Sequence, residues 1–196
     1  MKTTLNKLVS GSFALLLAIN ILCCSTDHVK QVRTFEQALN SHNIENYLTL
    51  FTDDISFRMG GLSGEGKQEL RKIAEWDSVL NSAFSFTDIM FISDTAICKC
   101  EEVNELINLM GIEIGTWDPV KIVFNDGLIQ YMSFEMTPEC YQADQEAWRS
   151  LLNWAENERS QQLSELRSEG KFVVNATSAK GWLALFREWR KATNQE

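Results

Sequence analysis

The side chains that could do chemistry lie on three predicted strands. Tyr131 and Glu135 are four residues apart in the segment 128–136, and a strand points such residues to the same face. Arg58 and Glu101 lie on two other predicted strands. A buried glutamate beside a tyrosine and an arginine can act as a general base, because its surroundings shift the pKa of its carboxyl group. The alternative is that Arg58 and Glu135 form a solvated or paired surface set and that Tyr131 belongs to the core.

A second candidate position lies where a long predicted strand is interrupted, around Gly115-Thr116-Trp117-Asp118-Pro119. With it, the predicted ligand-binding set has five members: Arg58, Glu101, Trp117, Tyr131 and Glu135. No residue is predicted to be catalytic. The direction of Tyr131 and Glu135 discriminates between functions, since a closed cavity around them favours a ligand site and an open sheet face favours an interaction surface.

No metal site and no cofactor are predicted, because the only histidines are His28 and His42 and no further ligands follow at zinc-binding spacing. Cys98 and Cys100 share one face of a predicted strand, where they can be small buried hydrophobes. The alternative is that one of them forms a disulfide with Cys140, which export would permit.

Composition favours a globular protein and argues against nucleic-acid binding. The 196 residues are 44% hydrophobic and include six tryptophans, which is typical of a chain with a buried core. The net charge of −9 leaves no basic surface to meet phosphate groups.

The N-terminus resembles a bacterial lipoprotein signal. Lys2 and Lys7 precede an apolar run over residues 8–22, which has the length of a signal-peptide core and is short for a membrane-spanning helix. Cys23 or Cys24 would then carry the lipid, so residues 1–24 are predicted to be a signal peptide. The predicted location is the bacterial cell envelope, with a membrane contact through the lipid anchor. An ordinary secreted form and an uncleaved anchor are the alternatives.

Hydrophobic periodicity predicts three helices followed by hairpins, an order that favours an α+β fold over an alternating α/β fold. The predicted helices are 28–39, 44–51 and 67–80, with a short helical insert at 104–111. The predicted strands are 55–59, 84–93, 96–103, 112–124 and 128–136. Thr52-Asp53-Asp54 is expected to stop the second helix in a turn, and residues 62–66 are expected to form a loop.

The composition changes after Pro138, where a helical extension over residues 138–196 is predicted to follow a domain over residues 25–137. Thr137 can cap the first helix of this extension and Asn175 the last. Five tryptophans fall on helical faces: Trp76, Trp148, Trp154, Trp182 and Trp189. They are predicted to fix the extension against the domain. The alternatives are that they form an aromatic lid over a pocket, or an exposed patch for a partner.

Two helices that run into a strand through Phe51-Thr52-Asp53-Asp54, with a third helix opened by Gly66-Lys67, resemble the SnoaL-like and nuclear transport factor 2-like families. The Gly-Trp-Leu-Ala-Leu segment at 181–185 is similar to one in some uncharacterised SnoaL-like proteins. The resemblance implies a cone-shaped, curved, mixed or antiparallel sheet wrapped around N-terminal helices, with a pocket between them and a C-terminal helical appendage added.

The same resemblance argues against the family's best-known chemistry. A ketosteroid isomerase has a tyrosine and two aspartates at positions that correspond to Phe35, Met59 and Val120, all of them apolar here. The dehydratase version uses histidine, and none follows His42.

Three functions are therefore predicted. The first is non-catalytic binding of a small apolar or amphipathic molecule in the cone pocket. The second is an isomerase, cyclase or lyase that uses a pocket carboxylate such as Glu135 or Glu101. The third is an envelope interaction module or homodimer.

Overall fold

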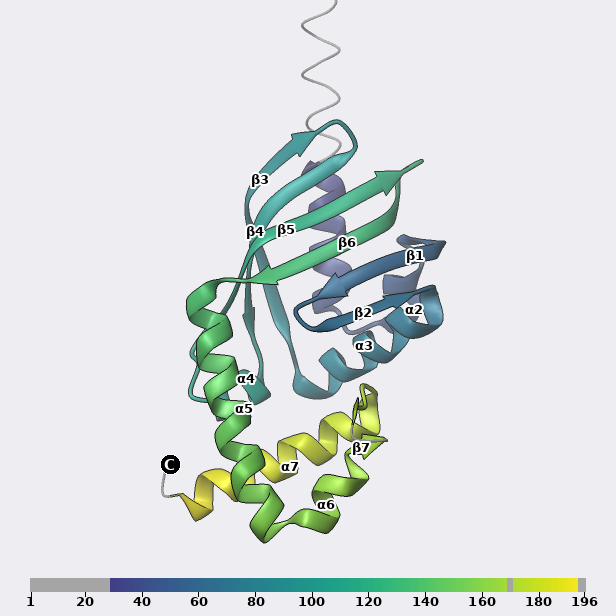
Figure 1. Cartoon of the computed structure of the whole chain (residues 1–196). Helices are drawn as coiled ribbons and strands as arrows, with labels where there is room; N and C mark the ends of the chain where they lie inside the picture. The colour runs from purple at the N-terminus through teal and green to yellow at the C-terminus, as the bar shows by residue number, and fades with distance from the viewer. Residues whose placement is uncertain (1–28, 169–170, 194–196) are drawn as a thin grey trace, which may run out of the picture.

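The protein is an α+β structure in which one curved, open sheet of six strands has helices at both ends of the chain (Figure 1). This computed structural model describes residues 29–168 and 171–193. The predicted signal peptide and the lipid acceptors Cys23 and Cys24 lie outside the described residues. Within the described part of the chain, no helix has the length and apolar character needed to cross a membrane.

The six strands follow the spatial order β2-β1-β6-β5-β4-β3. Of the predicted alternatives, a mixed or an antiparallel curved sheet, the structure has the mixed one (Figure 1). All neighbours are antiparallel except β1 and β6, which are parallel. The bounds are β1 Phe51–Met59, β2 Leu62–Glu65, β3 Ala83–Ile92, β4 Thr95–Val103, β5 Gly115–Asn125 and β6 Leu128–Met136.

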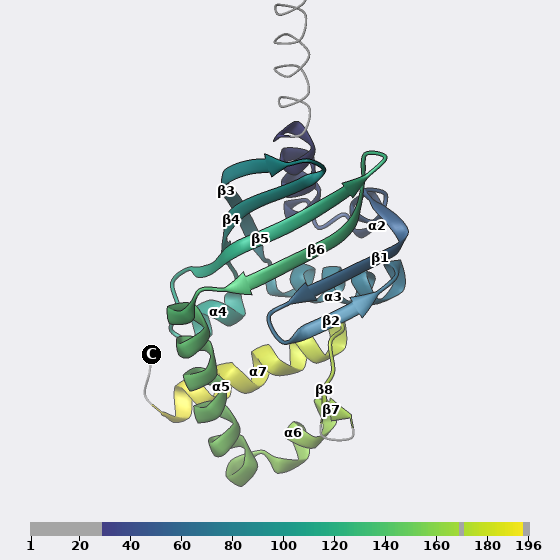
Figure 2. The ribbon, with the colours of Figure 1, turned by 45° about the horizontal axis from the view of Figure 1, so that its top comes forward.

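Three helices of the N-terminal half, namely the helix over residues 29–40, α2 (Ile44–Leu48) and α3 (Lys67–Leu80), lie on one side of this sheet (Figures 1 and 2). Phe35 anchors them, with its ring 6.0 Å from that of Tyr47, 6.1 Å from Phe51 and 5.5 Å from Phe86. Aromatic rings at such distances bury large apolar areas, so this cluster forms the first core of the molecule.

Several predicted boundaries were wrong. The second helix ends at Leu48, and the strand that follows already begins at Phe51, so Asp53 and Asp54 lie in β1 and not in a turn. The reason is backbone pairing, because Ile129 N–H donates to Leu50 C=O at 2.8 Å and draws this segment into the sheet. Residues 62–65, expected as a loop, form β2, and the strand predicted from residue 112 begins at Gly115.

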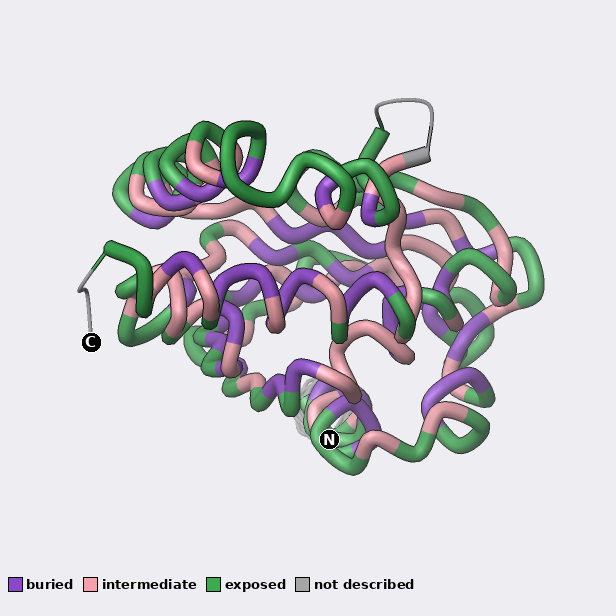
Figure 3. Tube along the Cα trace, turned by 90° about the horizontal axis from the view of Figure 1, so that it is seen from below, coloured by how far each residue is buried: buried purple, intermediate pink, exposed green. Residues whose placement is uncertain are grey.

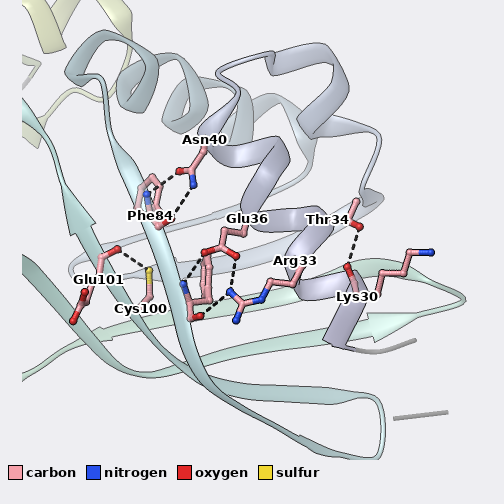
Figure 4. Close-up of polar contacts among 9 residues, drawn as sticks. Lys30, Arg33, Thr34, Glu36, Asn40, Phe84, Cys100 and Glu101 are labelled. Carbon is pink, nitrogen blue, oxygen red and sulfur yellow. Dashed lines mark hydrogen bonds and ion pairs between the residues drawn. The ribbon is translucent and has the colours of Figure 1, made fainter. Parts of the chain in front are cut away.

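Side chains of the N-terminal helix complete the hydrogen bonding of the edge strand β3 (Figure 4). The Asn40 amide donates to Phe84 C=O and accepts from Phe84 N–H, both at 2.8 Å. Two residues further on, Phe86 N–H donates to Glu36 at 3.0 Å and Phe86 C=O accepts from Arg33 at 2.8 Å. The helix thus replaces a neighbouring strand for two residues of β3.

The C-terminal part is helical, as predicted, and packs as a second core below the sheet (Figures 1 and 2). It contains α5 (Pro138–Glu158), α6 (Ser160–Glu165), the short strands β7 (Arg167–Ser168) and β8 (Lys171–Phe172), and α7 (Ala176–Ala192). The predicted caps are confirmed, since Thr137 caps α5 and Asn175 forms a capping box with Ser178 at the start of α7.

Helix α7 is the centre of this second core. It packs against α3, α5 and α4 (Glu105–Leu109), and its buried positions recur along one face in the view from below (Figure 3). Trp182 and Trp189 are buried in this core, while Trp76, Trp148 and Trp154 pack around it. The prediction that tryptophans fix the extension to the rest of the chain is therefore confirmed.

The cysteines Cys98, Cys100 and Cys140 are free and buried. The alternative of a disulfide to Cys140 was therefore wrong, and the interpretation as small buried residues holds. Burial raises the pKa of the Cys98 thiol to about 12, so this thiol is protonated and unreactive at neutral pH.

We expect Asn40→Ala to lower the free energy of unfolding by about 1 kcal/mol, because two exposed hydrogen bonds to β3 are lost. Urea denaturation measures the change. Gln37→Ala, an exposed position of the same helix, is the control and should stay within about 0.5 kcal/mol of the wild type. Equal stabilities of the two variants would contradict the role assigned to Asn40.

Candidate functional site

A cavity of about 510 Å³ lies between the inner side of the sheet and the C-terminal helices. Its walls are mainly apolar. The sheet and the N-terminal half contribute apolar side chains, namely Phe35, Leu39, Met59, Ile73, Phe84, Phe134 and Met136. The C-terminal half contributes Trp148, Leu152, Phe172, Val174 and Trp182. Residues from both halves of the chain thus line the cavity.

The most buried acid of the cavity is Glu102, which is 7% exposed. It accepts hydrogen bonds from Asn104 Nδ2 at 2.6 Å, from Trp117 Nε1 at 3.1 Å and from Ser82 Oγ at 3.3 Å. Burial raises the pKa of Glu102, and the three donors act in the opposite direction because they stabilise the charged form.

Local structure explains why these four residues meet. Strand alternation turns Cys98, Cys100 and Glu102 of β4 to the inner face. Asn104 follows directly and caps α4 through its Oδ1, which accepts from Ile107 N–H at 2.8 Å, so its amide nitrogen remains free for Glu102. Trp117 comes from β5, where it lies opposite Cys100.

Asp77 is the second carboxyl of the cavity. It lies on the face of α3 that also carries the buried Leu70, Ile73 and Leu80. Within the described residues, its carboxyl has no hydrogen-bond or ion-pair partner. Burial raises the pKa of Asp77 well above its usual value, and the neighbouring charge of Glu102 raises it further. Asp77 therefore holds a proton under conditions in which an exposed aspartate is charged.

Two further charged residues line the cavity from the C-terminal half. Asp144 on α5 accepts hydrogen bonds from Trp148 Nε1 and Gln145 Nε2, both at 3.2 Å, and burial raises the pKa of its carboxyl. Arg167 of β7 contributes the one guanidinium among the described lining residues.

Of the five residues predicted to bind a ligand, only Trp117 lines this cavity. Arg58 and Glu135 form an ion pair at 3.8 Å with side chains 62% and 45% exposed, which matches the solvated surface set. Tyr131 is half-buried, shares the outward parity of Glu135 on β6 and is absent from the cavity wall. Glu101 is exposed on β4.

Sequence reasoning missed Asp77 and Glu102, although each had a signal. Asp77 is an acid inside the apolar stripe of the predicted helix 67–80. Glu102 continues the alternation of Cys98 and Cys100, whereas its neighbour Glu101 has the opposite parity. Of the positions compared with the isomerase catalytic groups, Phe35 and Met59 line the cavity and Val120 is fully buried.

No protein-family model matches the sequence, and no curated protein matches it. Solved structures similar to the chain include a nuclear transport factor 2-like protein of unknown function from Cytophaga hutchinsonii. It is 11% identical, the match covers 59% of this chain and 94% of that chain, and the TM-score is 0.48.

Two other similar structures bear names of enzymes. One is a proposed ketosteroid isomerase from Kribbella flavida, at 14% identity over 55% of this chain and 76% of that one, with a TM-score of 0.47. The other is a proposed polyketide cyclase from Sinorhizobium meliloti, at 13% identity over 54% and 94%, with a TM-score of 0.48. Proteins of the class that the sequence resembles are thus among the similar structures, and no residue role is carried over from them.

We expect Glu102→Ala to lower the free energy of unfolding by about 2–3 kcal/mol, because the donors on Ser82, Asn104 and Trp117 lose their acceptor. Chemical denaturation measures the change. Glu101→Ala on the same strand is the matched control, since this side chain is exposed, and its effect should stay within about 0.5 kcal/mol. A similar loss in both variants would show that the network does not contribute as described.

We expect Asp77→Asn to raise the free energy of unfolding at neutral pH and to change this free energy little at acidic pH. A carboxyl whose folded pKa is raised binds a proton that the unfolded chain has already lost. Its contribution to stability is therefore complete below the unfolded pKa and is lost as pH rises through the folded value. Denaturation curves across this pH range should show that the difference in free energy of unfolding between variant and wild type grows as pH rises. A difference that does not depend on pH would contradict the raised pKa.

Proposed function

We propose that this protein binds a small apolar or amphipathic molecule in the cavity between the sheet and the C-terminal helices, without catalysing a reaction on it. The observation that carries the proposal is the cavity itself, about 510 Å³ in volume and walled mostly by aliphatic and aromatic side chains. Ligand sites are typically apolar hollows of several hundred Å³ with a few fixed polar groups. Glu102, held by three donors, is such a fixed group.

The proposed place of this binding is the bacterial cell envelope. This part of the proposal depends on the basic and apolar pattern of residues 1–22 and on the cysteines at 23 and 24. A lipid on one of these cysteines would hold the domain at a membrane surface, where amphipathic molecules are concentrated.

A second candidate function is an isomerase, cyclase or lyase, and one observation favours it. Asp77 and Glu102 line the same cavity, the charge of Glu102 raises the pKa of Asp77, and three donors favour the charged form of Glu102, so Asp77 can donate a proton and Glu102 can accept one. The roles that the sequence suggested for Glu135 and Glu101 would then fall to these two residues. A substrate that Asp77→Asn still binds but no longer converts would select this function.

A third candidate, an interaction module or homodimer, is favoured by the outward direction of Arg58, Tyr131 and Glu135 on the open face of the sheet. That face carries charged pairs, including Lys99 with Asp88 at 3.0 Å. Charged residues are depleted at the centres of stable interfaces, so this candidate ranks below the cavity.

Native mass spectrometry of the full-length protein, purified gently from cell membranes, tests the proposal. A retained small molecule of discrete mass that is lost on denaturation would support it, and the denatured mass would show whether Cys23 or Cys24 carries a lipid. A clean dimer or a co-purified protein, without a bound small molecule, would favour the interaction module instead.

We expect Met136→Trp to weaken binding of the neutral apolar dye Nile red at least about tenfold, because the larger ring fills part of the cavity. Dye fluorescence measures the affinity. The matched control is Met90→Trp, since Met90 is 62% exposed on β3 and lies away from the cavity wall. Equal dye affinity of the two variants would place the dye outside the cavity and contradict the proposed site.

A further inference from the structure

The charged residues of the cavity wall are mostly acidic. Asp77, Glu102 and Asp144 line it, and Arg167 is the basic residue among the described lining positions. A bound carboxylate or phosphate would thus face three carboxyl groups and one guanidinium in a mainly apolar wall. The balance of charge favours a ligand that carries positive charge.

The hydrogen bonds of these acids show which one is available to a ligand. Glu102 already accepts three hydrogen bonds, and Asp144 accepts two. Asp77 accepts none from the described residues. The Asp77 side chain is partly exposed and lines the cavity, so its carboxyl group is the lining acid that is available to pair with a ligand.

Aromatic rings next to Asp77 provide a second feature that suits a cation. Trp76 precedes Asp77 on α3, and its ring lies 5.4 Å from that of Phe172. Phe172 also contacts Trp148 at 5.3 Å and Trp182 at 5.0 Å. The faces of tryptophan rings attract ammonium groups, and they pack equally well against an apolar body.

We propose that the cavity takes an amphipathic amine, whose protonated amino group pairs with the Asp77 carboxylate and whose apolar body packs against the aromatic wall. This inference rests on the proposed binding function and names the chemical class of the ligand. Where Asp77 is protonated in the empty cavity, pairing with the ammonium group releases that proton to solvent. Glu102, already satisfied, keeps its role of fixing one end of the cavity.

Three probes with the same apolar chain test this proposal on the full-length wild-type protein: decylamine, decanol and decanoate. At neutral pH they end in an ammonium, a hydroxyl and a carboxylate group. Calorimetric titration, below the concentrations at which the probes self-associate, measures each affinity. We expect decylamine to bind at least about tenfold more tightly than decanol, and decanoate to bind most weakly.

The outcomes separate this inference from the proposed function. Equal affinities for decylamine and decanol would overturn the amine assignment and leave the binding function intact. Binding of none of the three would overturn the binding function and the inference with it. Because these measurements use the unaltered chain, they decide the ligand class even if a cavity variant fails to fold.

A pair of variants tests the role of Asp77. In Asp77→Asn the preference for decylamine over decanol should disappear while decanol affinity is kept. Asp53→Asn is the matched control, since the Asp53 side chain is 97% exposed and pairs with Lys67 on the surface, and it should bind all three probes as the wild type does. A preference that survives in Asp77→Asn would overturn the assignment of the amine to this carboxyl.

Discussion

The arrangement of the cavity depends on one buried carboxyl group, that of Glu102, and the three donors that surround it. Ser82, Asn104 and Trp117 reach the Glu102 carboxylate from the start of β3, the cap of α4 and the irregular part of β5. Removing a carboxylate from water is unfavourable unless such donors replace the water. The start of β3, the start of α4 and β5 are therefore held in one relative arrangement. That arrangement fixes the end of the sheet against which the C-terminal helices pack.

The two cores have different roles around this point. The first core, centred on Phe35, shapes the inner side of the sheet. The second core combines Leu80 of α3 and Leu106 of α4 with the buried face of α7, including Trp182 and Phe186. Helix α3 contributes to both cores, with Ile73 in the first and Leu80 in the second, and both residues line the cavity. The packing that stabilises the C-terminal helices therefore also shapes the space in which a ligand would bind.

The sequence predicted the parts of the fold that depend on local patterns. The α+β order followed from periodicity, and the caps at Thr137 and Asn175 followed from residue type and position. The second helix was extended too far because Phe51 fits the helical face of Ile44, Tyr47 and Leu48. Only pairing with β6 decides that Phe51 belongs to a strand. The four-residue strand β2 lies opposite β1 across Gly60-Gly61, and its own residues carry no alternating pattern.

The site was less accessible to sequence reasoning, for two physical reasons. On a strand, one residue of error reverses the face, and this is why Glu101 was chosen over Glu102. On β6, Tyr131 and Glu135 were correctly expected to lie on the same face of the sheet. Whether that face points inward depends on where the helices pack, which the strand itself does not show. The sequence offered an aromatic lid only as an alternative, because the long-range packing that brings Trp148 and Trp182 to the same cavity as Trp76 leaves no local pattern.

The bonding of Asn40, Glu36 and Arg33 to β3 has a consequence for how this sheet meets other chains. An uncovered edge strand is a template on which a foreign strand can add and start aggregation. At Phe84 and Phe86 the backbone groups are already occupied by the helix, and beyond them the ladder shifts register near Asp88, whose φ is 52°. An incoming strand would have to displace side chains that are tethered within the same chain. Resistance to growth at this edge is therefore built into the N-terminal helix, and local melting of that helix would remove it.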